Sequence, residues 1–248
     1  MKVVFHEDFY QVYTSDPAAA AGRMEAVVKA IGPHVDFVPA RPASEEQIAL
    51  VHGPNHIRRI KEMGLYEISA LAAGGAVQAA AMGLEEPAFA LIRPPGHHAS
   101  PDSSWGFCFF SNMAIALEVL IGTGRIRTAH VLDIDLHFGD GTVNSLKHRG
   151  DISIHNVSAP ERGAYLKEVA RELRLCDADV IGISAGFDNH EEDWGGTLKT
   201  EDYRDMGRMV REKAEHNRGG CFAVLEGGYN HDVLGQNVLA LTEGLSGK

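Results

Sequence analysis

The residues with the clearest chemical meaning lie in the short stretch from Asp133 to Thr142. Its sequence, Asp-Ile-Asp-Leu-His-Phe-Gly-Asp-Gly-Thr, follows an apolar run that ends at Leu132. Asp135 and His137 are two positions apart, so on an extended backbone both side chains point to the same side. A carboxylate and an imidazole that point to one place are suitable ligands for a divalent metal. The stretch therefore predicts part of a metal site.

The elements that must position these residues alternate between short apolar strands and helices. We expect strands at 2–6, 35–38, 88–92, 128–133, 151–155, 180–184 and 221–225. We expect helices at 21–31, 44–52, 55–63, 66–82, 112–121, 142–147, 165–175, 201–217 and 233–245. Such alternation is typical of a parallel sheet with helices on both faces. The sequence predicts one α/β domain over residues 1–248 with a single, mostly parallel sheet.

Ligands of such sheets bind beyond the carboxyl ends of the strands. Four predicted strands are followed there by loops that combine glycine with ionisable side chains, at 93–98, 133–142, 185–190 and 226–230. Asp188, in the third of these loops, supplies a third ligand beside Asp135 and His137. Three protein ligands leave a position open for water or substrate, as in catalytic sites, where the pKa of bound water falls to about 7.

The other ionisable residues of these loops suit proton transfer. His97 and His98 are adjacent, and the Pro-Pro-Gly segment before them allows the sharp turn that brings both imidazoles to one site. Two imidazoles near a metal act as proton acceptor and donor if carboxylates fix their tautomers, and Asp133 and Asp140 are the available partners. Tyr229 follows two glycines, so its hydroxyl can be placed to donate to an oxyanion.

Five segments resemble, in order and spacing, the signature blocks of the histone deacetylase superfamily, which includes acetylpolyamine amidohydrolases and acetoin-utilisation proteins. They are Arg-Pro-Pro-Gly-His-His-Ala (93–99), Gly-Phe-Cys-Phe-Phe-Ser-Asn (106–112), Asp-Ile-Asp-Leu-His (133–137), Ser-Ala-Gly-Phe-Asp (184–188) and Leu-Glu-Gly-Gly-Tyr (225–229). Five blocks in the right order are far more specific than any one of them. The resemblance, to short class II-like members, implies the arginase/deacetylase fold and zinc-dependent removal of an acetyl or other short acyl group from an amine.

The resemblance also implies roles for individual residues. Asp135, His137 and Asp188 match the zinc ligands, and His98, backed by Asp140, matches the general base and acid. His97, backed by Asp133, matches the electrostatic partner of that base. Tyr229 matches the residue that polarises the amide carbonyl.

Substrate contacts and cofactors follow from the same resemblance. Gly106 and Phe107 match one wall of an acyl-lysine tunnel, and Gly227 and Gly228 are further expected substrate contacts. A K⁺ or Na⁺ site is expected around Asp133, Asp135, His137, Ser153 and Ile154. Zinc is the expected catalytic metal, while Fe²⁺, Co²⁺ and Mn²⁺ are compatible with two carboxylates and one imidazole.

The chain departs from the family pattern at several places. Phe138 stands where a second histidine is usual, and Asn189 stands where alanine is usual. The long glycine-rich loop after the strand at 151–155 is reduced to 156–163, and the extended loop before the helix at 66–82 is missing. We therefore expect an open pocket, unless a second subunit of a homo-oligomer closes it.

The composition of the chain restricts its expected partners and its expected location in the cell. The 248 residues are 44% hydrophobic and carry a formal net charge of -11, which argues against a nucleic-acid partner and favours a small cationic acylated amine or an acyl-lysine peptide. The three cysteines are an odd number, so a disulfide framework is not expected and a reducing cytoplasm fits. No apolar run reaches membrane-spanning length, so we expect a soluble protein without a membrane partner.

Two rival functions remain open from the residues. An arginase-like dinuclear hydrolase needs further carboxylates, but Gly139 and His190 stand two residues after His137 and Asp188. This favours a single metal. A weakly catalytic protein that binds acylated ligands is the second rival, against which the retained His98 and Tyr229 argue.

Overall fold

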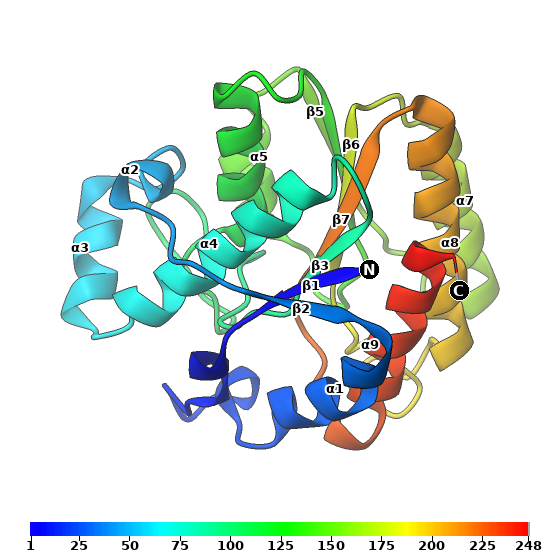
Figure 1. Ribbon diagram of the computed structural model, residues 1–248, viewed down its shortest axis with the longest axis horizontal. Coiled ribbons are helices and arrows are strands. Elements are labelled where there is room, and N and C mark those ends of the chain that lie inside the picture. The colour runs from blue at the N-terminus through cyan, green and yellow to red at the C-terminus, as the bar shows by residue number, and fades with distance from the viewer. Residues whose placement is uncertain (248) are drawn as a thin grey trace.

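The computed structural model describes residues 1–247 and is organised around one seven-stranded sheet (Figure 1). The strands are β1 (Lys2–Phe5), β2 (Asp36–Pro39), β3 (Ala88–Ala90), β4 (Ala129–Asp133), β5 (Ile152–Asn156), β6 (Val180–Ala185) and β7 (Gly220–Leu225). They lie in the order β2-β1-β3-β7-β6-β4-β5, and every neighbouring pair is parallel. The predicted parallel α/β sheet is confirmed.

Helices cover both faces of this sheet. They are α1 (Arg23–Ile31), α2 (Glu45–Ile48), α3 (Pro54–Glu62), α4 (Tyr66–Met82), α5 (Asn112–Gly122), α6 (Asp140–Leu146), α7 (Arg162–Leu175), α8 (Thr200–Asn217) and α9 (His231–Ser246). Helices α4 and α5 pack together on one face, while α1, α8 and α9 pack on the other with α7 beside them (Figure 1). Every residue of β4, β6 and β7 is buried, which explains why these strands are almost continuously apolar.

Most elements begin and end within a few residues of the predicted positions. The segment predicted as a loop between β1 and α1 contains two short 3₁₀ turns, η1 (Glu7–Tyr10) and η2 (Pro17–Ala19), and a third, η3 (Gly32–His34), follows α1. The difference that affects the site is the start of α6, which begins at Asp140 rather than at Thr142. The carboxylate of Asp140 thereby lies in the first turn of a helix, where the unpaired N–H groups favour negative charge.

The strand order decides which loops meet. Strands β3, β7, β6 and β4 are four consecutive neighbours in the sheet, although they are far apart in the sequence. Because all four are parallel, their carboxyl ends lie along the same edge. These are the four strands whose following loops carry the predicted chemistry, so the sheet brings the loops to one place.

Helix α4 packs tightly because its middle consists of small residues. A Cβ atom at Gly74 would overlap the carbonyl oxygen of Arg41 and the backbone nitrogen of Ala43. The backbone of residues 41–43 therefore approaches the helix so closely that only glycine fits at position 74. Within residues 1–247, no helix is both long enough and apolar enough to cross a membrane.

Replacement of Gly74 by alanine tests this packing. Alanine is the better helix former, but the overlap with the backbone near Arg41 should destabilise the protein by about 2 kcal/mol. Gly122, at the end of α5, is the matched control because nothing lies within 4 Å of the position that a Cβ atom would take there. Gly122→Ala should leave the free energy of unfolding unchanged or slightly raised. Denaturant unfolding of both variants measures the difference, and equal stabilities would contradict the close contact.

Candidate active site

Two carboxylates and one imidazole converge where β4 and β6 end. Asp135 and His137 follow β4, Asp188 follows β6, and one ligand atom from each lies within 4.8 Å of the other two. Asp135 and Asp188 are buried, while the His137 side chain is 37% exposed. The three predicted metal ligands are therefore brought together, with one side of the group open to solvent.

The hydrogen bonding of this group fits a cation. Oδ2 of Asp135 accepts from the backbone N–H of Gly227 at 2.8 Å, and Oδ1 of Asp188 accepts from that of Leu136 at 3.0 Å. Oδ2 of Asp188 is buried without a hydrogen bond, although Nδ1 of His137 lies 3.0 Å away. A buried carboxylate oxygen without a donor is costly, so a positive ion at this position would satisfy it.

The electrostatics of the group point the same way. The hydrogen bond to Asp135 and the close approach of the Asp188 carboxylate raise the pKa of His137 to about 10. Burial, followed by the charge of Asp135, raises the pKa of Asp188 to about 6. Both shifts show that the group is stabilised by positive charge. Without a metal, a proton on His137 supplies this charge, and a bound metal would replace that proton.

The histidine pair lies in the loop after β3. Nδ1 of His97 is 3.2 Å from Oδ2 of Asp133, and Nδ1 of His98 is 2.7 Å from Oδ1 of Asp140. The loop turns so sharply that the two imidazole centroids are only 4.0 Å apart. Each histidine thus has the carboxylate neighbour that the sequence predicted.

The surroundings of the two histidines shift their pKa values in opposite directions. Burial alone would lower the pKa of His97, but the negative charges of Asp135 and Asp133 outweigh it and hold that pKa well above its usual value. Burial, together with the positive charge of His97, lowers the pKa of His98 to about 4, although Asp140 opposes the shift. The surroundings therefore favour the charged form of His97 and the neutral form of His98.

Tyr229 stands at the same edge, within a cluster of aromatic rings. Its ring stacks on Trp194 at 4.1 Å and meets the edge of Phe107 at 5.9 Å. Burial, followed by the charge of Asp135, raises the pKa of the phenol far above its usual value. The hydroxyl therefore remains protonated and is able to donate a hydrogen bond.

The sequence pattern of the histone deacetylase domain matches residues 18–171 and 164–245. The chain belongs to the histone deacetylase domain family. Membership confirms the predicted class, a hydrolytic deacetylase, while the substrate and the metal need separate arguments.

Relatives of this histone deacetylase family member cover most of the chain. A histone deacetylase-like amidohydrolase of Pseudomonas aeruginosa is 30% identical over 93% of this chain and 79% of the relative. A probable deacetylase of Methanothermobacter thermautotrophicus is 29% identical over 99% of this chain and 91% of the relative. An acetylpolyamine amidohydrolase of Mycoplana ramosa is 30% identical over 64% of this chain and 57% of the relative.

A solved structure confirms the architecture. The crystal structure of the HDA15 HD domain superposes with a TM-score of 0.84 over 99% of this chain and 89% of that one, at 22% sequence identity. The predicted arginase/deacetylase fold is therefore confirmed.

The predicted substrate-contact residues fall into two groups. Gly106 and Phe107 lie beside the histidine pair, and a Cβ atom at Gly106 would overlap the His98 ring. Gly227 instead supports a metal ligand, since its N–H donates to Asp135. A Cβ atom on Gly228 would point toward Leu234 and Phe187 in the interior. The two glycines before Tyr229 therefore serve close packing at the rear of the site.

The residues of the predicted K⁺ or Na⁺ site are spread over two neighbouring strands and the loop after β4. Ser153 and Ile154 pair with His130 and Val131 of β4, before the metal ligands along the strand, and Oγ of Ser153 lies 2.8 Å from Nδ1 of His130. The residue paired with Asp133 is Asn156, which the sequence did not single out. The hydrogen-bond ladder between β4 and β5 determines which β5 residue comes nearest to Asp133, and this cation site stays a prediction.

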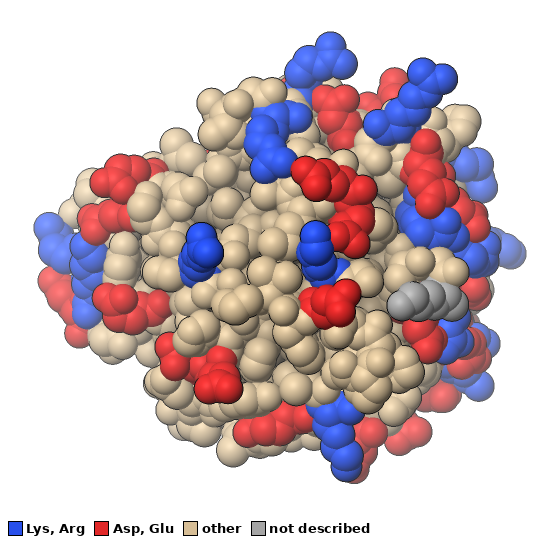
Figure 2. All heavy atoms as spheres, viewed as in Figure 1, with Lys and Arg blue, Asp and Glu red and all other residues tan. Residues whose placement is uncertain are grey.

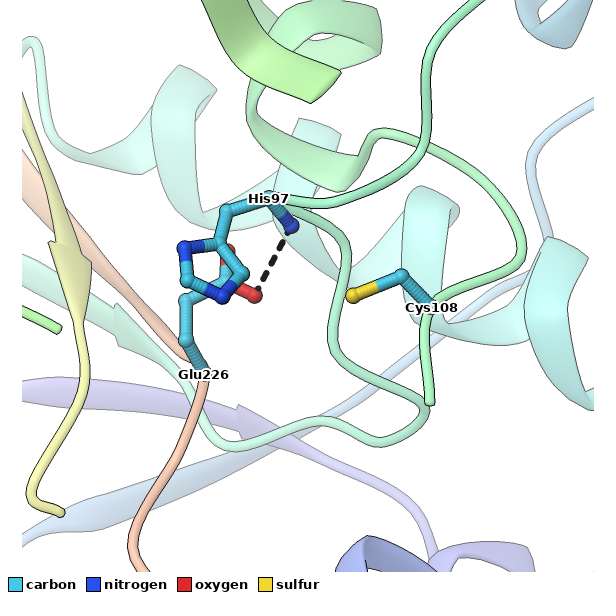
Figure 3. A group of neighbouring side chains, drawn as sticks. All are labelled: His97, Cys108 and Glu226. Atoms are coloured by element: carbon cyan, nitrogen blue, oxygen red, sulfur yellow. Dashed lines mark hydrogen bonds between the residues drawn. The ribbon is translucent and has the colours of Figure 1, made fainter. Parts of the chain in front are cut away.

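One residue that the sequence left without a role is Glu226, buried beneath the histidine loop (Figure 3). Its Oε2 accepts from the backbone N–H groups of Gly96 and His97 at 2.7 and 3.1 Å, and the thiol of Cys108 faces the same space. Burial raises the pKa of Glu226 to about 7 and that of Cys108 well above its usual value. Glu226 thus holds the turn that places both imidazoles. A charged residue directly after an apolar strand was the available signal.

Arg23 was also missed, because its sequence context indicates only a helix. It is buried and donates to the carbonyl oxygens of Gly228 at 2.8 Å and Glu226 at 2.7 Å. Its guanidinium carbon lies 5.6 Å from the centre of the Tyr229 ring. Arg23 thereby fixes the segment that carries Tyr229, across more than two hundred residues of sequence.

Metal binding should strengthen as the pH rises. Below a pKa of about 10, a proton on His137 competes with the metal, and below about 6 a proton on Asp188 competes as well. Between about pH 6 and 8 the Kd for Zn²⁺ should therefore fall about tenfold per pH unit. Competition titrations against a chelating dye measure it, with Asp188→Asn as a control that should bind far more weakly throughout. A Kd independent of pH would contradict ligation by His137.

Proposed function

We propose that this protein is a zinc-dependent amidohydrolase that removes an acetyl or other short acyl group from the amine of an acyl-lysine or an acylpolyamine. The observation that carries the proposal is the meeting of a three-ligand metal group with two histidines, each backed by its own carboxylate. The surroundings of these histidines also drive their pKa values apart. Two adjacent imidazoles that differ in this way can take different roles, one as a proton-transfer group and the other as a fixed positive charge.

Asp135, His137 and Asp188 would hold the metal. Zinc suits two carboxylates and an imidazole, and Fe²⁺, Co²⁺ and Mn²⁺ accept the same donors. A divalent ion bound there supplies a Lewis acid that polarises the acyl oxygen and lowers the pKa of a water molecule.

His98 would take the proton from the attacking water. Its low pKa leaves the imidazole neutral, and the Nδ1–H group would donate a hydrogen bond to Asp140, so Nε2 is the free base. The same nitrogen would then protonate the leaving amine. His97 would not exchange protons in this scheme, because Asp133 and Asp135 hold its charge, and that charge would stabilise the negative oxygen of the tetrahedral state.

Tyr229 would donate its hydroxyl to the same developing oxyanion. Its phenol stays protonated because the site is buried and negatively charged. The stacked Trp194 ring, the edge of Phe107 and the Arg23 guanidinium limit its movement. A donor that is fixed before the reaction stabilises the transition state without a cost of reorganisation.

Substrate would enter between aromatic walls. Phe107 forms one wall, and Trp194, from the loop between β6 and α8, meets the edge of the His137 ring at 6.0 Å and forms another. The shortened loop at 156–163 contains no aromatic residue that could add to them. Aromatic faces pack on the alkyl chain of an acyl-lysine, and they also attract the remaining ammonium groups of an acylpolyamine. The net charge of -11 favours the same class of substrate.

The setting that we propose follows from the surface and the cysteines. On the face shown in Figure 2, acidic and basic side chains are interspersed, without a continuous basic patch among the residues described. A nucleic-acid partner is therefore not part of the proposal. The three cysteines, Cys108, Cys176 and Cys221, are free and buried, which suits a reducing cytoplasm.

A dinuclear, arginase-like reaction is disfavoured by the same geometry. Among residues 1–247, a second group that could hold a metal consists of His97, Cys108 and Glu226, but it is fully buried and shares no bridging carboxylate with Asp135, His137 and Asp188. Gly139 offers no side chain, and His190 is buried with its Nε2 3.3 Å from Oγ1 of Thr200. One metal is therefore the better proposal.

Turnover of acyl amines tests the function. Purified protein loaded with Zn²⁺ is assayed with acetyl-lysine peptides, acetylpolyamines and longer acyl groups, and its metal content is determined. Asp188→Ala should lower kcat/KM about 10³-fold, because it removes a ligand. Asp205→Ala, on the outer face of α8 and paired with Arg208, is the matched control and should retain full activity. Equal, measurable rates for Asp188→Ala and the unsubstituted protein would rule out the metal-dependent reaction, and no turnover by either would favour a binding protein.

The role of Tyr229 is tested by Tyr229→Phe, which keeps the ring and its packing. Loss of one oxyanion donor should lower kcat about 10²- to 10³-fold with little change in KM. Steady-state kinetics measures both constants. A variant in which only KM rises would indicate that Tyr229 contacts the substrate as part of a wall instead.

A further inference from the structure

Trp105 packs directly on the proposed base. Its ring centroid lies 3.8 Å from that of His98, with 31° between the ring planes. His98 is also packed by the ring of His97 at 4.0 Å. Trp105 itself is 56% exposed, yet the His98 side chain beneath it is only 4% exposed. The indole therefore covers the base from solvent.

The indole also hydrogen-bonds to the carboxylate that orients His98. Nε1 of Trp105 donates to both oxygens of Asp140, at 3.1 and 3.0 Å, and Oδ1 of the same carboxylate lies 2.7 Å from Nδ1 of His98. Burial would raise the pKa of Asp140, but the donations from Trp105 and His98 hold it below its usual value. Asp140 is thus held from two sides as an anion.

The backbone fixes the indole in this place. Gly106 and Phe107 both have positive φ, 58° and 67°, and the N–H of Cys108 donates to the carbonyl of Trp105 at 3.0 Å. A side chain at Gly106 would overlap His98, so the loop wraps tightly around the imidazole. Positive φ at a phenylalanine is a strained conformation that is found chiefly where surrounding structure imposes it.

We infer that Trp105 is a positioning residue of the hydrolytic reaction. Its indole N–H keeps Asp140 oriented toward His98, and its ring shields the His98 imidazole from solvent. The inference rests on the proposed function for His98. Without the indole, the partly exposed carboxylate would be free to rotate toward water, and His98 would lose the partner that keeps Nε2 unprotonated and directed at the substrate.

Two substitutions separate the two contributions. Trp105→Phe keeps a ring over His98 but lacks the N–H, and should lower kcat about tenfold with KM within about twofold. Trp105→Ala lacks both and should lower kcat by a further factor of about five. Phe37→Ala, which removes a half-exposed ring from β2 at the far edge of the sheet, is the control and should keep the unsubstituted kcat.

A second readout does not depend on turnover. Carbethoxylation of His98 by diethyl pyrocarbonate, located by mass spectrometry, should be several-fold faster in Trp105→Ala and near the unsubstituted rate in Trp105→Phe and Phe37→Ala. If Trp105→Ala does not fold, Trp105→Phe carries the kinetic test.

The results distinguish this inference from the proposed function. An unsubstituted protein that hydrolyses no acyl amine would refute the function, while the labelling would still report whether Trp105 shields His98. An active protein whose Trp105 variants keep the original kcat and labelling rate would refute the inference alone. A rise in KM with unchanged kcat would also overturn it, because Trp105 would then be a substrate wall.

Discussion

The constraint on which this structure depends is the burial of several carboxylates at one edge of a parallel sheet. Asp133, Asp135, Asp188 and Glu226 are each at most 3% exposed. Buried negative charge is unstable unless donors or cations compensate it. Backbone N–H groups of neighbouring loops satisfy part of the demand, the cationic His97 satisfies another part, and a metal between Asp135 and Asp188 would satisfy the rest. The chemistry of the site is largely the consequence of that balance.

The same balance makes two adjacent histidines unequal. His97 lies among buried carboxylates, which raise its pKa. His98 is buried beside His97, and both effects lower the pKa of His98. Neighbours in sequence would be expected to behave alike, and only a sharp turn gives them different surroundings. Glu226 holds that turn from below and Trp105 covers it from above, so residues outside the ligand group help to give the two imidazoles different surroundings.

The open side of the site is built differently from the buried side. The residues on the buried side are held by backbone hydrogen bonds and close glycine contacts, while the open side carries the aromatic rings of Phe107 and Trp194, which both contact Tyr229. Rings of this kind supply contact area and favour cations without fixed polar contacts. A rigid floor and an aromatic entrance suit an enzyme that needs one precise acyl position and accepts variety in the amine.

The sequence by itself determined the parallel α/β sheet, the family and the pairing of each histidine with its carboxylate. The sheet and the first two ligands depend on local pattern, namely apolar strands ending in polar loops and ligands spaced two residues apart. The pairing of each histidine with its carboxylate joins residues 36 and 42 positions apart and followed from the family resemblance. Asp188 could be joined to Asp135 and His137 because carboxyl ends of parallel strands share one edge. The tertiary structure alone decided the rest. The register of β5 on β4 places Asn156, not Ser153, beside Asp133, and no local pattern specifies a register. Arg23 reaches Gly228, and Trp105 reaches Asp140, through contacts between distant segments whose proximity exists only once the core has packed.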